Sequence, residues 1–316
     1  MTHRRHRPGF TFLELIFVIV IMGILAKFGT EIFVNIYRAY NMSNVQNRLQ
    51  SATELAMQQI ANRLHYRIKD SVIARSNAAT FQGLPSATGN ERILEWVGYD
   101  IDGWQGSWRN GFNRPTWSGF IDVDAVDTAN ADFNTLFSPD SDTARINTVI
   151  TDMRSNGSGT TFPNSAIFFI GANADVQTYF GWNGAAAAEQ NATAAHRINY
   201  GAAAQQFDAL VDDFQSVDIY EQYKLSWSAY AIAWEDTGVI GDGLGDLFLY
   251  YDYQPWEGEA YNNAVNITNR KQLLLENVDT FKFQAVGNMI MLQICVNDEN
   301  IMGDGGYSLC KEQAIF

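Results

Sequence analysis

A short run near the N-terminus, residues 9–14 (GFTFLE), and the apolar stretch behind it restrict what this chain can become. Arginines stand at positions 4, 5 and 7, and from Phe10 to Ala26 the only charged residue is Glu14. An acidic residue near the centre of a membrane-spanning helix costs about 2.5–3.5 kcal/mol. Glu14 therefore requires a cationic partner, and we expect the rest of the fold to serve that pairing.

Two ordinary export signals account poorly for this segment. A cleaved signal peptide has an apolar centre and a cleavage site of small residues, but Glu14 interrupts the centre and residues 25–27 (LAK) offer no such site. A plain signal anchor would place the arginines on the cytoplasmic side. Its apolar run of about 17 residues is at the short end of the lengths that span a bilayer. Neither alternative explains Gly9 or Glu14.

The run resembles the processing motif of type IV pilins and of type II secretion pseudopilins. In that motif a short basic leader ends in Gly, Phe follows, and Glu is the fifth residue of the mature chain. The resemblance implies that residues 1–9 are a leader, that prepilin peptidase cuts between Gly9 and Phe10, and that the new amine of Phe10 is methylated. It also implies that Phe10 and Glu14 form an assembly contact between subunits.

The pairing of this amine with Glu14 has a physical reason. Burial disfavours charge on both groups unless they pair. The two groups are four residues apart on one helix, so pairing within one subunit is strained. Pairing with the amine of a neighbouring subunit neutralises both charges and fixes the axial stagger. We therefore predict that Glu14 sets the register of assembly and takes no catalytic part.

A single long helix is predicted behind the motif. No proline occurs between Phe10 and Leu84, and no glycine occurs between Gly29 and Gly83. The helix is therefore expected to run to about Arg75, a length of ~100 Å at 1.5 Å per residue.

The two halves of this helix differ in character. Residues 10–28 are apolar all round, which suits a membrane or the helices of sister subunits. Residues 29–75 are amphipathic, with apolar residues three or four apart, and are predicted to pack on a globular domain of residues 76–316. These apolar residues form one stripe along the helix: Val45, Leu49, Ala52, Ala56, Ile60, Leu64, Ile68 and Val72.

Strands dominate the predicted body, so the fold class expected is α+β, with the long N-terminal helix packed on an antiparallel sheet. By size and by the run 273–286, the chain is most similar to large J-type minor pseudopilins or W-type minor pilins. Glu14 argues against the K-type, whose members lack the motif Glu. Strands are predicted at 92–101, 118–123, 166–170, 226–234, 246–253, 278–286 and 289–296, helices at 143–153 and 202–214, and a surface helix or loop at 185–195.

Composition limits the function classes. The chain has 316 residues, of which 47% are hydrophobic and 13% aromatic, which is ample for a core. Its formal charge is −14. An acidic chain of this kind is not expected to bind nucleic acid, because that affinity rests on Lys and Arg contacts to phosphate. The charge also argues against adhesion to anionic lipid surfaces.

The two cysteines, Cys295 and Cys310, are close together near the C-terminus. In an exported domain such a pair is expected to form a disulfide, worth about 3 kcal/mol for a short loop. Two free cytosolic thiols are the alternative. A zinc site is a weaker one, because no histidine is nearby.

Two loops carry candidate calcium ligands, Asp242 and Asp246 in one and Asp298 and Asp304 in the other. Short oxygen ligands on glycine-rich loops suit Ca²⁺, which takes 6–8 oxygens, although plain Asp-Gly turns explain both loops equally well. Asn191, in residues 189–193 (EQNAT), resembles the extended acceptor site of bacterial N-glycosylation, with chance as the alternative.

Four of the tryptophans lie close together in the sequence: Trp96, Trp104, Trp108 and Trp117. Exposed tryptophans would form a sugar-binding or protein-binding face. Buried ones would fill a core or a contact between subunits, and we expect this second arrangement.

No catalytic motif is present: the sequence has no Gly-x-Ser-x-Gly elbow, no His-Glu-x-x-His and no glycine-rich phosphate loop. After removal of the leader only His65 and His196 would remain. We therefore expect a structural protein and no enzyme.

The expected role is that of a minor pilin or pseudopilin, incorporated into a filament or initiating it at the tip, in a type II secretion system, a type IV pilus or a DNA-uptake machine. Head-to-tail contacts that do not close generate such filaments. The alternative is a tip adhesin or substrate-binding module delivered on a pilin stem. Expected partners are other subunits, prepilin peptidase and the inner-membrane assembly platform. The expected location is the inner membrane, with the N-terminus cytoplasmic and the body periplasmic, and then the filament.

Overall fold

A computed structural model describes residues 9–77, 79–106, 114–125, 134–172, 174–237, 243–263, 267–298 and 307–316. The chain divides into two compact units. The first unit comprises Met1–Ser51 and Asp298–Tyr307, and the second comprises Ala52–Asn297 and Ser308–Phe316. We describe each unit by itself.

The long helix α1 spans Phe12–His65, so the sequence predicted its start well and its end wrongly. Residues beyond the helix form a short 3₁₀ turn, η1 (Lys69–Ser71), and then strand β1 (Ile73–Arg75). All three residues of β1 are buried. A helix lying on a domain surface buries only one stripe, whereas a strand in the middle of a sheet that is covered on both faces buries every residue. The predicted stripe therefore continues through Ile68 and Val72 without remaining helical.

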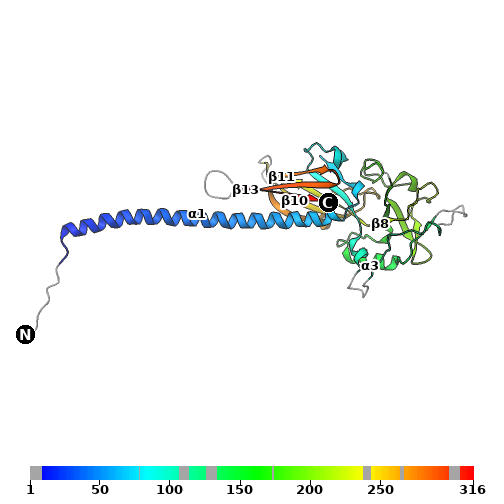
Figure 1. Ribbon diagram of the computed structural model, residues 1–316, viewed down its shortest axis with the longest axis horizontal. Helices are drawn as coiled ribbons and strands as arrows, with labels where there is room; N and C mark the ends of the chain where they lie inside the picture. The colour runs from blue at the N-terminus through cyan, green and yellow to red at the C-terminus, as the bar shows by residue number, and fades with distance from the viewer. Residues whose placement is uncertain are drawn as a thin grey trace, which may run out of the picture. The chain divides into compact units, whose positions relative to one another are not determined.

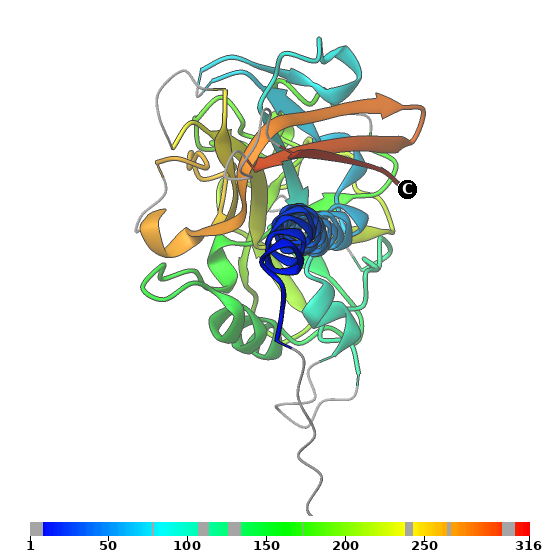
Figure 2. The ribbon, with the colours of Figure 1, turned by 90° about the vertical axis from the view of Figure 1, so that its left-hand side faces the viewer.

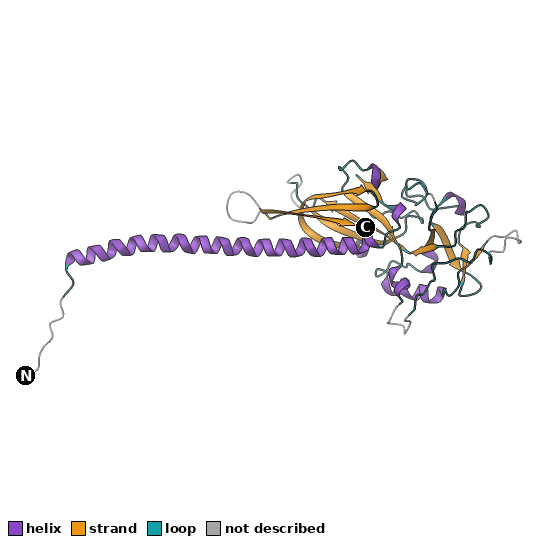
Figure 3. Ribbon diagram, in the orientation of Figure 1, coloured by secondary structure: helices purple, strands orange, loops and turns teal. Residues whose placement is uncertain are grey.

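The second unit contains a larger sheet of eight strands among the described residues (Figures 1 and 3). Every strand pair whose register is given is antiparallel. In spatial order the strands are β13 (Tyr307–Ile315), β12 (Met289–Asp298), β11 (Lys271–Val286), β10 (Gly245–Tyr253), β9 (Ser228–Glu235), β3 (Ile93–Gly98), β1 and β2 (Phe81–Gly83).

A second, smaller sheet has five antiparallel strands among the described residues. In spatial order they are β4 (Thr135–Phe137), β7 (Gln206–Ala209), β6 (His196–Tyr200), β5 (Ala166–Phe169) and β8 (Tyr223–Ser226). The helices of this region are α2 (Ile101–Gln105) and α3 (Thr143–Met153), and the remaining short turns are η2 (Leu84–Ser86), η4 (Phe162–Asn164), η5 (Gln190–Ala192) and η6 (Ile267–Arg270).

Strand β5 separates two hydrophobic cores, because neighbouring residues of a strand point to opposite faces. Ala166 and Phe168 lie in a first core with residues of β1, β3, β9 and β10. Ile167 and Phe169 lie in a second core with Ile146 and Ile150 of α3. The first core thus joins the two sheets, and the second fills the space between the smaller sheet and α3.

The opposite face of the larger sheet is also buried. On β3, Ile93 and Val97 belong to the first core, whereas Leu94 and Trp96 point the other way and are fully buried. The end of α1 that belongs to the second unit runs beside strands of the larger sheet (Figures 1 and 2). Its buried apolar side chains are Ala56, Met57, Ile60, Ala61 and Leu64, and Thr53 is buried with them. The α+β expectation of a helix on an antiparallel sheet is confirmed.

Several other element predictions are confirmed, and two are wrong in addition to the end of α1. Helix α3 and strands β3, β5, β9, β10 and β12 lie where the sequence predicted them, and β11 begins earlier, at Lys271. Residues 202–214, predicted as a helix, contain strand β7, whose Phe207 is a fully buried member of the second core. Residues 118–123, predicted as a strand, contribute only an isolated bridge at Phe120, because Gly119 has a φ of +77° that breaks an extended run.

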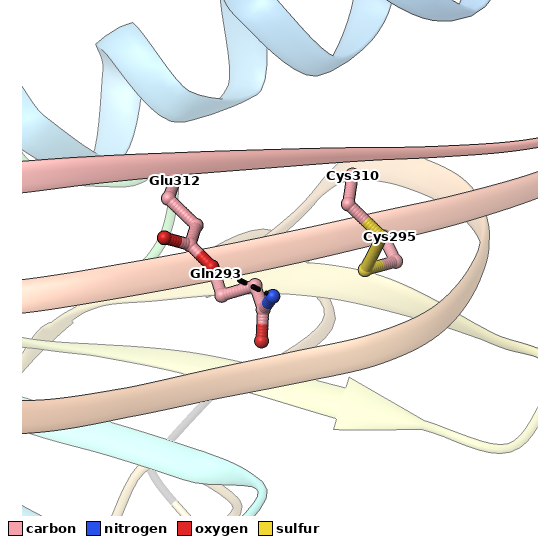
Figure 4. Close-up of a disulfide and its surroundings, with 4 residues drawn as sticks. All are labelled: Gln293, Cys295, Cys310 and Glu312. Carbon is pink, nitrogen blue, oxygen red and sulfur yellow. Dashed lines mark hydrogen bonds between the residues drawn. A yellow bond between two sulfur atoms is a disulfide. The ribbon is translucent and has the colours of Figure 1, made fainter.

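The predicted disulfide is present between Cys295 of β12 and Cys310 of β13 (Figure 4). A second cross-strand contact lies two residues along each strand, where the Gln293 amide donates a hydrogen bond to the Glu312 carboxylate at 2.9 Å. The two pairs run in opposite directions along the chain, as in an antiparallel ladder. The disulfide therefore fastens the edge strand β13 to its neighbour.

Candidate functional site

The N-terminal segment forms the candidate site, and Thr11 fixes where its helix begins. The Thr11 hydroxyl accepts a hydrogen bond from the backbone N–H of Glu14 at 3.3 Å, and the Thr11 carbonyl accepts one from Leu15 at 3.2 Å. Thr11 followed three residues later by Glu14 is the sequence pattern of a capping box. An acidic residue in the first turn is also favoured by the helix dipole.

Gly9 and Phe10 consequently lie outside the helix. The Phe10 side chain is 80% exposed, and nothing lies within 4 Å of the position that a Cβ on Gly9 would occupy. The peptide bond that joins Gly9 and Phe10 is thus an accessible bond in a non-helical segment, four residues before Glu14. A peptidase needs such a bond, because it must bind its substrate in an extended form.

The apolar residues in the first part of this helix, from Phe12 to Phe28, are exposed in the structure. An 18-residue window of α1 has a mean hydropathy of 2.3 with none of it buried, so by length and composition the helix can cross a membrane. The exposed apolar surface continues past Ala26 to Phe33, Tyr37 and Met42. An apolar surface of this extent marks contact with lipid or protein.

Glu14 forms no ion pair with any other described residue. It lies in an exposed apolar stretch whose only other polar side chain before Ala26 is that of Thr11. Among the described residues, this segment therefore combines an accessible bond with a carboxylate that forms no ion pair.

The four proposed calcium ligands are only partly described. Asp242 and Asp304 lie outside the described residues. The Asp246 carboxylate accepts hydrogen bonds from the Thr237 hydroxyl and the Asn277 N–H, at 2.5 and 3.2 Å. Asp298 is buried and accepts one from Arg48 at 2.6 Å. No cluster of three or more potential ligands occurs among the described residues, so calcium binding stays a prediction.

The proposed glycan acceptor, Asn191, is exposed in η5. Thr193, two residues on, is buried, and its hydroxyl donates a hydrogen bond to the Tyr179 carbonyl at 3.0 Å. An enzyme that reads this threonine would reach it more easily before folding than after. Glycosylation at Asn191 also stays a prediction.

The tryptophans divide between core and surface. Trp96 and Trp117 are buried, as expected for core residues, whereas Trp104 is 40% exposed. Trp108 lies outside the described residues. No feature of the sequence distinguishes the exposed Trp104 from the buried Trp96 and Trp117.

His196 is buried and hydrogen-bonded, with its Nδ1 3.3 Å from the Gln190 side-chain oxygen. Burial lowers the pKa of His196 to about 4, so the ring is neutral at pH 7. Its ring neighbours are Phe169 and Phe214. This is the environment of a core histidine.

A buried ion pair was not foreseen from the sequence. Arg75 of β1 donates to the Glu95 carboxylate of the adjacent strand β3 at 2.5 Å, and both side chains are at most 2% exposed. Arg75 also donates to the Trp182 carbonyl at 3.1 Å, and the Tyr253 hydroxyl donates to Glu95 at 3.2 Å. Burial and the Glu95 carboxylate raise the pKa of Tyr253, which keeps that hydroxyl protonated as a donor. The group links β1, β3 and β10 inside the first core.

Arg67 joins three chain segments at the end of α1. Its guanidinium donates to the carbonyls of Leu64, Asn288 and Phe316, at 2.7, 3.2 and 3.2 Å. It thereby gives the Leu64 carbonyl, at the end of the helix, a second donor besides the Arg67 backbone N–H, which lies 3.2 Å away. No pattern in the sequence marked Arg67 or the Arg75–Glu95 pair, because each depends on partners distant in the chain.

Comparison with protein families gives one match. The family model described as the prokaryotic N-terminal methylation motif matches residues 4–26. These residues include the Gly9–Phe10 bond, Glu14 and the apolar stretch to Ala26. Neither the curated proteins nor the solved structures contain a match to the chain.

Proposed function

We propose that this chain, a type IV pilin- or pseudopilin-like protein that carries the prokaryotic N-terminal methylation motif, is a minor structural subunit of a filament. The single observation that carries the proposal is the arrangement of residues 9–14, with an accessible bond ahead of the helix and an unpaired carboxylate in its first turn. The motif implies processing by prepilin peptidase and contacts with other pilins.

Cleavage of the leader would create a cation that can pair with Glu14. Hydrolysis of the bond joining Gly9 and Phe10 releases residues 1–9 and leaves a cationic amine on Phe10. In an assembled subunit whose helix extends to Phe10, at 1.5 Å per residue, this amine would lie ~6 Å along the helix axis from Glu14 of the same subunit. A neighbouring helix shifted by that distance brings its Phe10 amine level with Glu14. Each subunit then pairs with the next, and the stagger of the filament is set.

The strength of this pairing follows from Coulomb's law. Two unit charges 4 Å apart attract by about 1 kcal/mol in water and about 4 kcal/mol at an effective dielectric constant of 20. An apolar environment made of neighbouring helices corresponds to the larger figure. The pairing offsets the cost of placing Glu14 in an apolar run, which is of the same magnitude. Glu14 is therefore unfavourable in an isolated subunit and tolerated in an assembled one.

The proposed location is the inner membrane, followed by the filament. The arginines at positions 4, 5 and 7 favour a cytoplasmic N-terminus. The Cys295–Cys310 disulfide suits a body in an oxidising compartment such as the periplasm. The inner-membrane assembly platform is the further proposed partner.

The test replaces Glu14 and compares it with a matched acid. Glu14→Ala should leave the protein folded and membrane-inserted but reduce its incorporation into filaments at least tenfold, because about 1.4 kcal/mol of lost pairing changes an equilibrium tenfold. Glu31→Ala removes an exposed acid from the same helix beyond residue 26, and should incorporate normally. Incorporation is measured by quantitative blotting of sheared filaments against the membrane fraction. Equal incorporation of both variants would show that Glu14 does not set the register.

A further inference from the structure

A cavity of about 260 Å³ opens on the second unit beside Trp104. We call it the Trp104 cavity. Its walls come from segments far apart in the chain: Trp104 from α2, Phe120 from the segment that follows α2, Ile170 from the turn after β5, and Lys224 from β8. Only the fold brings these segments together, and therefore no sequence pattern predicts the cavity.

The aromatic wall of the cavity is rigid on its inner side. Trp117 is 2% exposed, and its indole N–H donates to the buried Asp100 carboxylate at 3.2 Å. The Trp104 ring packs on Trp117 with 4.8 Å between ring centroids, and its outer part stays 40% exposed. Phe120 and Ile170 at the rim are 50% and 46% exposed. Exposed aromatic residues on a fixed support are typical of the anchoring positions of protein interfaces.

A positive charge lies at the same place. The Lys224 ammonium is 4.1 Å from the centre of the Tyr99 ring, and it forms no ion pair with a described acidic residue. Burial, together with the charges of Lys69 and Arg67, lowers the pKa of Lys224. In a chain with a formal charge of −14 this is a local concentration of positive charge. An anion bound there would restore the interaction that the ammonium loses by burial.

Few other polar groups of the cavity are available to a bound molecule. The Tyr223 hydroxyl is hydrogen-bonded to Ser138 at 2.8 Å, and the Trp117 N–H is used by Asp100. The Lys224 ammonium, the Tyr99 hydroxyl and the exposed Gln222 amide remain. A sugar ring carries a hydroxyl on most of its carbons, and those facing the apolar wall would lose their hydrogen bonds to water. An apolar side chain has no hydrogen bonds to water to lose at this wall.

We propose that the Trp104 cavity binds a segment of a partner protein in which an aromatic or branched aliphatic side chain stands next to a carboxylate. The apolar side chain fills the space beside Trp104 and Phe120, and the carboxylate pairs with Lys224. The proposal does not depend on the processing or register of the N-terminal segment. It assigns a recognition site to the second unit.

The test measures peptide binding to the full-length protein in detergent micelles by saturation-transfer NMR. The probe is the peptide Ac-Gly-Ser-Phe-Asp-Gly-NH₂, with a dissociation constant expected on the order of 1 mM, a weak affinity suited to one anchoring side chain and one ion pair. Two matched peptides replace its Phe by Ala or its Asp by Asn, and each should bind at least fivefold more weakly. Oligogalacturonate is the saccharide probe and should not bind.

Variants locate the binding. Trp104→Ala should abolish binding of the Phe-Asp peptide, and Lys224→Gln should weaken it about fivefold and remove its dependence on salt. Tyr200→Ala and Lys282→Gln remove an exposed aromatic residue and an exposed lysine outside the cavity, and should bind as the unmodified chain does. Thermal unfolding verifies that each variant is folded.

Three results would overturn the proposal: no peptide binding up to ~10 mM, binding unchanged in folded Trp104→Ala and Lys224→Gln, or binding of oligogalacturonate in place of the peptide. The last result would assign the cavity to an acidic saccharide.

Discussion

Two buried groups of the second unit, His196 and Asp100, should each make the free energy of unfolding depend on pH. Because their effects have opposite signs, they nearly cancel in the unmodified chain. Burial lowers the pKa of His196 from its ordinary value of 6.5 to about 4. Burial raises the pKa of Asp100 from 3.8 to about 6, with a smaller contribution from the charge of Asp102. Both side chains are at least 95% buried, so solvent screening of either shift is small.

The two shifts have opposite signs. Between pH 6.5 and 4 the unfolded chain protonates His196 while the folded chain does not, so this group makes stability fall as the pH falls. Between pH 4 and 6 the folded chain keeps the proton of Asp100 while the unfolded chain has lost it, so this group makes stability fall as the pH rises. At 1.36 kcal/mol per pKa unit each effect amounts to about 3 kcal/mol. From pH 4 to 6 they nearly cancel.

Single replacements should separate the two effects. Relative to the unmodified chain, His196→Gln removes the loss of stability at low pH. The difference in unfolding free energy between this variant and the unmodified chain should therefore shift by about 3 kcal/mol in favour of the variant as the pH falls from 6.5 to 4. For Asp100→Asn the difference should shift in favour of the variant by a similar amount as the pH rises from 4 to 6.

Tryptophan fluorescence during urea unfolding measures these differences, because all eight tryptophans lie at residues 96–256, within the second unit. His65→Gln, which replaces an exposed histidine, is the matched control and should give a difference that does not depend on pH. A pH-independent difference for His196→Gln would refute the assignment of a neutral, buried histidine. The same result for Asp100→Asn would show that its carboxylate is not protonated in the fold.

Two further predictions concern the second unit. Arg75→Met should lower the unfolding free energy by about 3–5 kcal/mol, because it leaves the Glu95 carboxylate buried without its cation, and Arg75→Met combined with Glu95→Leu should recover most of that loss. A urea-unfolding double-mutant cycle checks this; additive losses would contradict it. Replacing Cys295 and Cys310 together by Ser should lower the unfolding free energy by about 3 kcal/mol. The same measurement under reducing conditions should give the unmodified chain a similar loss, and equal stability with and without reductant would contradict it.

The sequence predicted those features that rest on local pattern. Residues 9–14 and the apolar stretch behind them form a pattern of adjacent residues. That pattern alone predicted where α1 begins and identified the N-terminal motif. Helix α3 and strand β10 are bounded by turn residues and have strong periodicity. The disulfide could also be predicted from the sequence, since a chain with two cysteines allows only one pairing within the chain.

Prediction failed where tertiary contacts overrode local preference. The apolar spacing predicts that the helical stripe of α1 continues to Val72. Ile73 and Ala74 instead lie in β1 with a paired strand on each side, and helix periodicity does not encode that pairing. The segment 202–214 has helix-favouring alanines, yet Phe207 is held in the second core by a strand.

Contacts between residues distant in the chain were the least accessible to sequence reasoning. Arg75 and Glu95 are 20 residues apart and meet only because β1 and β3 pair. Trp104 and Lys224 line one cavity although α2 and β8 are distant in the chain. Their residue types indicated buried aromatics and solvated charges, and only the fold shows which of them meet.

The central claim is that the chain is cut between Gly9 and Phe10 and that the new N-terminus takes part in assembly. Its most direct test is mass spectrometry of the N-terminal peptide of the protein isolated from membranes. The expected result is a peptide that begins with N-methylated Phe10 and retains Glu14. An intact N-terminus at Met1, or a mature end beyond Ala26, would contradict the claim.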